Sequence, residues 1–216
     1  MPLTTITAWE ALFDRMGVDR LESRLPGDAK TLLVIGGAGG VGSIAIQLAK
    51  TVAGLRVVAT ASRPESAAWC HALGADAIID HHEPFLDQFT RAGLSEADYI
   101  FCLNSTEAHI QNMADVIKPQ GKLCLIVEAK GPVNINPLQR KSVALCWELM
   151  FTRSLFQTSD MQAQHDLLNE AADLFDAGVL RTTMTRNVGV LDAAHLKQAH
   201  ADIERGDTIG KLTLSV

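Results

Sequence analysis

The sequence predicts an α/β protein whose parallel, doubly wound sheet carries helices on both faces. Apolar runs of strand length alternate along the chain with longer segments of helical periodicity, and this alternation is typical of βαβ units. Right-handed crossovers then place the helices on the two faces of the sheet. Of the 216 residues, 47% are apolar and 20% are charged, so the chain can bury a core.

The predicted strands are short apolar runs that end at glycine or another turn residue. They cover residues 32–35, 57–60, 77–79, 99–103 and 122–127, with an edge strand at 142–150 and a closing strand at 212–216. The sequence predicts helices over 41–52, from Pro64 to just before Gly74, near 83–92, and from Ile110 through Ile117, closed by Pro119.

Two further helices are predicted in the last third of the chain. Ser159 and Gln162 have the spacing of a capping box, and Gly178 is expected to end the helix that they open. Asp192 is predicted to cap the last helix. Three apolar residues are expected on one face of that helix: Leu196, Ala199 and Ile203.

Charge and composition exclude several classes of partner. The formal net charge of −6 argues against a nucleic-acid partner, because such a partner requires a basic face. No apolar run approaches the length of a membrane span, and the first residues lack the basic and apolar regions of a signal peptide. We therefore expect a cytoplasmic protein with no nucleic-acid or membrane partner.

The cysteines and histidines show no spacing that is typical of a metal site. Four cysteines lie far apart in the sequence and are expected to be reduced, buried thiols: Cys70, Cys102, Cys124 and Cys146. His81 and His82 are neighbours, and in an extended chain their side chains would point to opposite sides. His195 and His200 do not share a helical face. No metal site is expected.

A glycine-rich turn after the first predicted strand contains the motif that best indicates what the chain binds. Gly37, Gly39 and Gly42 form a G-x-G-x-x-G pattern between a strand and a helix, which is the context that supports dinucleotide binding. Gly37 would allow the tight turn, Gly39 would let a pyrophosphate approach, and Gly42 would let helix and strand pack. The alternative is a glycine-rich turn without a ligand. A P-loop is excluded, because no Gly-Lys-Ser/Thr follows.

The end of the second strand indicates which dinucleotide binds. NAD-binding chains carry an acid there, about 20 residues after the glycines, to hold the ribose hydroxyls. Residues 60–64 contain no acid, whereas Ser62 and Arg63 can hydrogen-bond and pair with a 2′-phosphate. The sequence therefore favours NADP(H) over NAD(H). The alternative is that Arg63 is a solvated surface residue ahead of a helix.

Beyond these motifs, the sequence resembles the medium-chain dehydrogenase/reductase superfamily, and within it the quinone oxidoreductase-like and zinc-type alcohol dehydrogenase-like members. The resemblance covers essentially the whole chain and rests on segments 36–42, 46–50, 59–65, 73–76, 147–153 and 210–211. It implies a Rossmann domain over residues 1–181, followed by a segment, 182–216, that returns to the catalytic domain. In this superfamily a GroES-like catalytic domain precedes the Rossmann domain, and the expectation is that this chain starts after it, at the entering helix.

The resemblance also assigns cofactor contacts by position. Gly39, Gly40 and Val41 match the pyrophosphate turn, and Ser62 and Arg63 match the 2′-phosphate end. Four other contacts match positions spread along the chain: Thr7 on the entering helix, His81 near the 2′-phosphate end, and Asn104 and Val127 beside the nicotinamide. Many relatives place a lysine where this chain has Ser66, so Arg63 is the main expected phosphate partner. Zinc ligands are expected in the absent domain, so zinc is not expected here and no catalytic residue is assigned.

Three functions remain open at this point. The first is the nucleotide-binding portion of an NADPH-dependent oxidoreductase that transfers hydride to a small-molecule quinone, enone or other carbonyl. The second is a stand-alone dinucleotide-binding or sensor module without turnover, and the third is a structural piece that mainly dimerises. A homodimer is expected through the strand at 142–150. Its apolar residues alternate as Val143, Leu145, Trp147 and Leu149.

Overall fold

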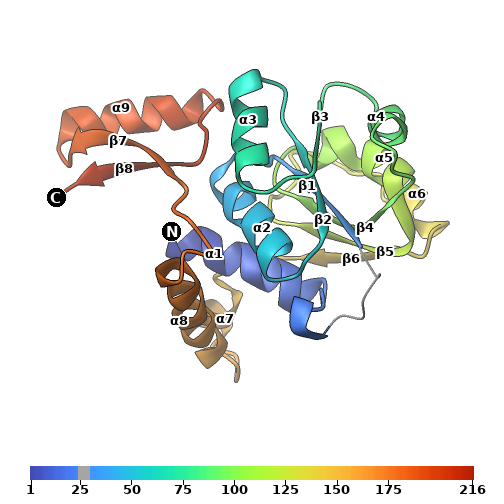
Figure 1. Ribbon diagram of the computed structural model, residues 1–216, viewed down its shortest axis with the longest axis horizontal. Helices are drawn as coiled ribbons and strands as arrows, with labels where there is room; N and C mark the ends of the chain where they lie inside the picture. The colour runs from blue at the N-terminus through green and yellow to red at the C-terminus, as the bar shows by residue number, and fades with distance from the viewer. Residues whose placement is uncertain (24–29) are drawn as a thin grey trace.

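The computed structural model describes residues 1–23 and 30–216, and its main body is a parallel sheet between two layers of helices (Figure 1). The strands are β1 (Thr31–Ile35), β2 (Arg56–Thr60), β3 (Ala77–Ile79), β4 (Ala97–Cys102), β5 (Ile117–Leu125), β6 (Ala144–Trp147), β7 (Met184–Val190) and β8 (Lys211–Ser215). The α-helices are α1 (Pro2–Trp9), α2 (Gly40–Thr51), α3 (Pro64–Ala72), α4 (Phe85–Arg91), α5 (Thr106–Val116), α6 (Asn136–Gln139), α7 (Thr152–Phe156), α8 (Gln162–Asp176) and α9 (Ala193–Glu204). A π-helix, η1 (Glu10–Arg15), continues α1, and a short 3-10 turn, η2 (Leu21–Ser23), follows it.

In the described residues, six strands form one sheet in the order β3-β2-β1-β4-β5-β6, and every neighbouring pair is parallel. Leu33 of β1 lies opposite Val58 of β2 and Ile100 of β4. The chain runs outward from β1 to β3, then returns to β4 on the other side of β1. Such a reversal opens a crevice at the carboxyl ends of the central strands, where doubly wound sheets bind ligands.

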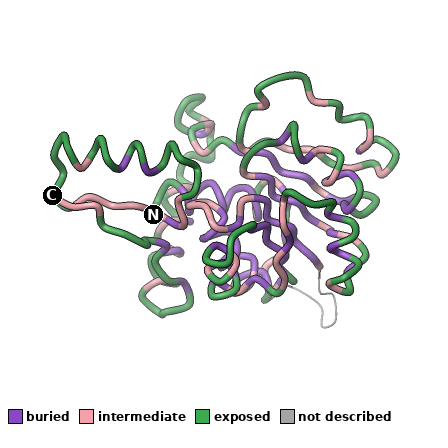
Figure 2. The backbone as a smooth tube through the Cα atoms, turned by 90° about the horizontal axis from the view of Figure 1, so that it is seen from above, coloured by how far each residue is buried: buried purple, intermediate pink, exposed green. Residues whose placement is uncertain are grey.

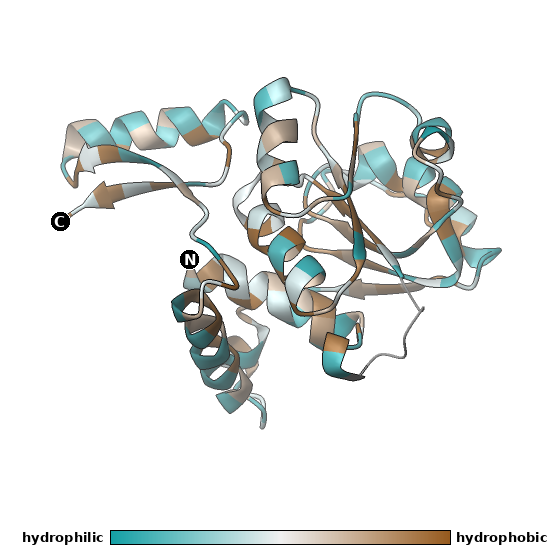
Figure 3. Cartoon of the chain, in the orientation of Figure 1, coloured by the Kyte–Doolittle hydropathy of each residue, from teal (hydrophilic) through white to brown (hydrophobic). Residues whose placement is uncertain are grey.

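Each face of the sheet has its own hydrophobic core, because side chains alternate along the strands. Leu32 and Val34 point into the core under α1, α2, α3 and α8, whereas Leu33 and Ile35 point into the core under α4, α5 and α6. Figure 2 shows the buried segments gathered inside the main body with exposed segments around them, and Figure 3 shows apolar residues concentrated along the sheet. The predicted doubly wound sheet with helices on both faces is confirmed.

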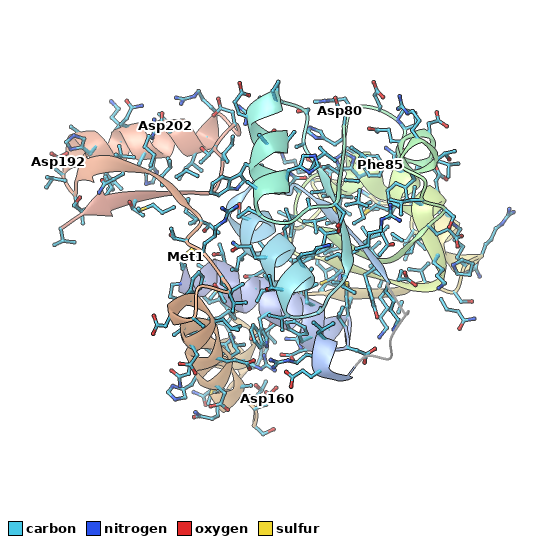
Figure 4. The ribbon with its side chains drawn as sticks, in the orientation of Figure 1. Met1, Asp80, Phe85, Asp160, Asp192 and Asp202 are labelled. Atoms are coloured by element: carbon cyan, nitrogen blue, oxygen red, sulfur yellow. The ribbon has the colours of Figure 1, made fainter. Side chains whose placement is uncertain are left out.

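Several predicted boundaries need correction. Helix α5 ends at Val116, and Ile117 already begins β5, so the predicted helix is one residue too long. Helix α8 begins at Gln162, with Met161 as N-cap and no side-chain cap, so the capping box at Ser159 is wrong. The neighbouring Asp160, labelled in Figure 4, instead accepts hydrogen bonds from Thr158 Oγ1 at 2.6 Å and Arg153 Nε at 3.0 Å.

The final segment forms a βαβ unit apart from the main sheet. Strands β7 and β8 pair in parallel, with α9 between them in sequence. Asp192 caps α9 as predicted, accepting from the His195 backbone N–H at 2.8 Å. Of the expected apolar face, Ala199 is buried, but Leu196 and Ile203 are 43% and 58% exposed. Strand β7 was not predicted, because its mostly polar, exposed residues show no apolar alternation.

Strand β6 lies at the edge of the sheet, as predicted, although it is shorter than the predicted 142–150. Apolar side chains that are 48% to 76% exposed extend from this strand through α7: Trp147, Leu149, Phe151, Leu155 and Phe156. Single exposed apolar residues are ordinary, but here five large ones follow one another from the sheet edge into α7.

A buried ionic network lies directly behind this edge. Arg15 Nε donates to Glu148 Oε2 at 2.8 Å, and Arg153 Nη1 lies 2.6 Å from Glu10 Oε1. Glu10 and Glu148 are almost fully buried. Burial, followed by the neighbouring Glu10, raises the pKa of the Glu148 carboxyl to about 8. The network joins the π-helix at the end of α1 to β6 and α7.

All four cysteines are free thiols; Cys70, Cys102 and Cys124 are buried as expected, and Cys146 is half-buried. Among the described helices, none combines the length and apolar character that crossing a bilayer requires.

Candidate nucleotide-binding site

A cavity of about 360 Å³ opens at the carboxyl ends of β1, β2, β3 and β4, the position that the fold predicts for a ligand. Four segments of the chain line it: the glycine-rich turn, residues 60–63, the turn after β3, and residues 104–109 at the start of α5. A fifth segment, residues 206–208, closes it from the returning part of the chain. We call this cavity the nucleotide cleft.

The glycines of the turn have distinct steric roles. Gly36 has φ +84°, a left-handed conformation that favours glycine, so Gly36 makes the tight turn that the sequence assigned to Gly37. A Cβ at Gly37 would lie 2.8 Å from Ala59 Cβ, so Gly37 instead lets the turn pack against β2. A Cβ at Gly42 would lie 2.4 Å from the Gly36 carbonyl oxygen, which supports the predicted packing role.

The same turn presents the start of α2 to the cleft. Gly39 lines the cleft and is the N-cap of α2, whose first turn contains no acidic residue. Backbone N–H groups at a helix start have no intrahelical acceptor, and the helix dipole adds partial positive charge there. Gly40 and Val41 follow in that first turn, beside a second hollow shared with Lys211. This arrangement favours an anionic ligand group.

At the end of β2, Ser62 and Arg63 line the cleft. Arg63 is the N-cap residue of α3, and Ser66 Oγ donates to the Arg63 carbonyl at 2.9 Å while accepting from its N–H at 3.3 Å. Ser66 is therefore committed to capping the helix. Arg63 Nη2 donates to the Asp207 backbone carbonyl at 2.6 Å, and Arg63 Nη1 lies 3.9 Å from Asp207 Oδ2.

Sequence reasoning missed the segment that carries Asp207. Asp207 lies 144 residues after Arg63 in the sequence, and no local sequence pattern links the two positions. The Gly210 N–H also donates to the Ala38 carbonyl at 2.8 Å, so the returning segment is hydrogen-bonded to the glycine turn itself. Residues 60–64 contain no acidic residue, but the fold places Asp207 of the returning segment in the lining of the cleft.

Three histidines line the cleft next to the end of β2. His81 and His82 lie in the turn after β3, with ring centroids 4.1 Å apart, so the prediction that they point to opposite sides is wrong because this turn is not extended. His109, on the first turns of α5, stacks on Phe85 at 5.7 Å, and its ring centroid is 6.1 Å from that of His81. Figure 4 labels Phe85 and Asp80 at this end of the sheet.

The remaining predicted contacts are more scattered. Asn104 follows β4 and lines the cleft close to Gly36. Val127 follows β5, is 40% exposed and lies outside the residues that line the cleft. Thr7 is buried in α1, where its hydroxyl donates to the Leu3 carbonyl at 3.1 Å. Neighbouring Ser105 has φ +47°, an uncommon conformation for serine, and was not predicted as a cleft residue.

One group of possible metal ligands lies together among the described residues, and it includes two histidines of the cleft. One set of three is close enough to be considered: Asp80, His81 and His82. Asp80 Oδ1, however, accepts from the His82 N–H at 2.9 Å and lies 2.9 Å from His82 Nδ1. Asp80 and His82 are therefore joined by hydrogen bonds within the turn.

Comparison with known proteins agrees with this fold. Residues 73–214 match the model of a family described as zinc-binding dehydrogenase. A zinc-type alcohol dehydrogenase-like protein of Staphylococcus aureus is 38% identical over 216 residues, which cover 100% of this chain and 64% of the relative. A solved structure of a candidate zinc-dependent alcohol dehydrogenase from Rhizobium etli has a TM-score of 0.92 at 45% identity, covering 100% of this chain and 62% of that chain.

A mycobacterial protein whose solved structure is complexed with NADPH has a TM-score of 0.78 at 26% identity, covering 99% of this chain and 62% of that chain. The architecture is thus that of the Rossmann-type nucleotide-binding domain of medium-chain dehydrogenases and reductases. The chain belongs to the zinc-binding dehydrogenase family, which confirms the resemblance seen in the sequence. It spans 64% of the length of the curated relative from S. aureus.

Proposed function

We propose that this chain is the nucleotide-binding portion of an NADPH-dependent oxidoreductase that transfers hydride to a quinone, enone or other carbonyl compound. One observation carries the proposal: the nucleotide cleft joins a glycine turn at a helix start to a β2 end that offers Ser62 and Arg63 in place of an acid. The NADPH complex of the mycobacterial relative supports the choice of cofactor.

Each part of the cleft has a role in this proposal. The N–H groups of Gly39, Gly40 and Val41 hold the pyrophosphate, and Ser62 and Arg63 hold the 2′-phosphate. Asn104 and Val127, which follow β4 and β5, flank the nicotinamide. NADPH supplies the hydride when bound, and the protein supplies position and electrostatics. Arg63 must exchange its hydrogen bond to the Asp207 carbonyl for one to the phosphate.

Replacing Arg63 tests the cofactor assignment. A hydrogen bond between charged groups contributes about 1.5–3 kcal/mol, so Arg63→Ala is expected to weaken NADPH binding about tenfold or more. NADH lacks the 2′-phosphate, and its affinity is expected to stay nearly unchanged. Calorimetric titration of both nucleotides into both proteins measures the difference.

Arg140→Ala is the matched control, because Arg140 is exposed and lies outside the nucleotide cleft. It removes one positive charge from the chain without touching the β2 end, so both affinities are expected to persist. Equal losses for NADPH and NADH in Arg63→Ala would contradict the assignment of Arg63 to the 2′-phosphate.

We also propose that the chain forms a homodimer through the edge strand β6 and the apolar residues that follow it. A two-fold contact between identical edges would cover Trp147 and Leu149, both about half exposed. Sedimentation at micromolar concentration is expected to show a dimer, and Trp147→Glu is expected to shift it to monomer. Leu86→Glu is the control, since Leu86 is similarly exposed on α4. A wild-type chain that is wholly monomeric would rule out this contact.

A further inference from the structure

The nucleotide cleft contains a histidine cluster, of which the cofactor assignment uses only His81, as a contact near the 2′-phosphate end, and gives no role to His82 and His109. His81 and His82 come from the turn after β3, and His109 comes from α5, so two separate elements converge on one wall. Because β3 pairs with β2, this wall adjoins Ser62 and Arg63. In a doubly wound fold, the end of β2 faces the adenosine ribose of a dinucleotide.

One ring nitrogen of His109 lacks a hydrogen-bond partner in the described part of the chain. Its side chain lines the cleft, the residue is only 7% exposed, and its Nδ1 atom has no hydrogen-bond partner among the described residues. Buried polar atoms are nearly always hydrogen-bonded, and leaving one unpaired is unfavourable. Stacking on Phe85 fixes the ring plane but gives Nδ1 no partner. An incoming polar ligand group is the natural partner.

We propose that His81, His82 and His109 recognise the 2′-phosphate electrostatically, taking up a proton from solvent when the phosphorylated cofactor binds. The proposal rests on the proposed function, and it adds that the preference for NADPH over NADH depends on pH. The preference is expected to grow as the pH falls, because each bound proton is linked to bound phosphate.

The surroundings of His81 and of His109 favour the neutral forms of these two rings. Burial, followed by His82, lowers the pKa of His81, and burial, followed by His81 and His82, lowers the pKa of His109. The opposing charges are Asp80 in the same turn and Glu107 on α5. Two further charged residues line the cleft, Arg63 and Asp207, and they form an ion pair with each other.

A bound phosphate dianion would instead favour the protonated forms of these imidazole rings. An opposite charge close to an imidazole favours its protonated form, and both ring nitrogens of the protonated form are donors. A ribose hydroxyl carries no charge and gives no such effect. The second ionisation of a phosphate ester lies near pH 6, so at pH 7.5 the 2′-phosphate is already ionised. Any proton taken up at that pH therefore goes to the protein.

Calorimetry at pH 7.5 in two buffers that differ in ionisation heat measures the protons exchanged on binding. We expect uptake of about half to one proton with NADPH and none with NADH. Between pH 7 and 8, NADPH affinity is expected to fall by about three- to tenfold more than NADH affinity. In the double variant His81→Gln/His109→Gln, which keeps only His82 of the cluster, both the uptake and the difference in pH dependence are expected to fall by more than half.

His200→Gln is the matched control, because His200 is exposed on α9 and lies outside the cleft. Circular dichroism and thermal melting establish that each variant is folded, and His82→Gln provides a single change at the most exposed ring of the cluster. Equal proton uptake with NADPH and NADH would overturn the proposal, and so would unchanged uptake in the double variant. An equal loss of affinity for both nucleotides would show that the rings only stack on adenine. Failure of NADPH to bind at all would overturn the proposed function, whereas NADPH binding without proton uptake would overturn this inference alone.

Discussion

A polypeptide of these 216 residues is expected to bind NADPH but to oxidise it with quinones or enones far more slowly than an ordinary enzyme. The glycine turn and Arg63 both line the cleft within this chain, so NADPH binding is expected without any further segment. The chain spans 64% of the length of its S. aureus relative, and Val127, which is proposed to lie beside the nicotinamide, is 40% exposed. Holding two reactants in line contributes about 7–11 kcal/mol to catalysis, and most of that term is expected to be lost.

The measurement is NADPH oxidation with a panel of quinones and enones, run beside a binding titration on the same sample. Binding without turnover agrees with the proposed placement of the nicotinamide, and it also agrees with a dinucleotide sensor. A turnover number of about 1 per second or more would show that this chain alone builds the active site. The expectation of slow turnover would then be wrong.

Gly42→Ala is expected to abolish binding of both nucleotides and to destabilise the fold. The added methyl group would lie 2.4 Å from the Gly36 carbonyl oxygen and 2.6 Å from that of Gly37. Both atoms belong to the backbone of the turn, so relief requires moving α2 away from β1. Overpacking of this kind costs about 1–3 kcal/mol, or more where the backbone must shift. Thermal unfolding and calorimetry measure the two effects.

Substitution of two other glycines distinguishes a loss of packing from a loss of ligand binding. A Cβ at Gly131 meets nothing within 4 Å, so Gly131→Ala is expected to leave stability and binding unchanged. A Cβ at Gly39 meets only the Gly36 carbonyl oxygen, at 3.4 Å, so Gly39→Ala is expected to fold yet bind both nucleotides more weakly. Tight NADPH binding by Gly42→Ala would contradict the assigned role of the turn.

The sequence predicted the central sheet because its strands are short, continuous apolar runs, such as Leu32 to Ile35, that end at turn residues and alternate with segments of helical periodicity. It also located the glycine turn, although the tight turn belongs to Gly36 rather than Gly37. Strand β7 escaped prediction because its residues are mostly exposed and polar. A strand that pairs only at the periphery carries little apolar periodicity.

Predicting the cleft was harder than predicting the sheet, because its walls come from distant parts of the chain. Ser62 and Arg63 follow a strand end and could be identified from local spacing. Asp207 reaches Arg63 only through the fold of the returning segment, and His109 reaches His81 only because α5 packs beside the turn after β3. Local patterns contain no information about such contacts, which arise from tertiary packing.

The carboxyl group of Glu148 gives the sheet edge an unusual response to alkali. Its pKa of about 8 exceeds the ordinary value of 4.5, so the folded chain holds this proton more tightly than the unfolded chain does. The resulting stabilisation is complete below about pH 4.5 and is lost as the pH rises through about 8. In most folded proteins the pKa of a carboxyl group is lowered instead, so the stabilisation that it gives is lost as the pH falls. Because Glu148 directly follows β6, mildly basic conditions are expected to loosen the rim at which two copies of the chain would meet.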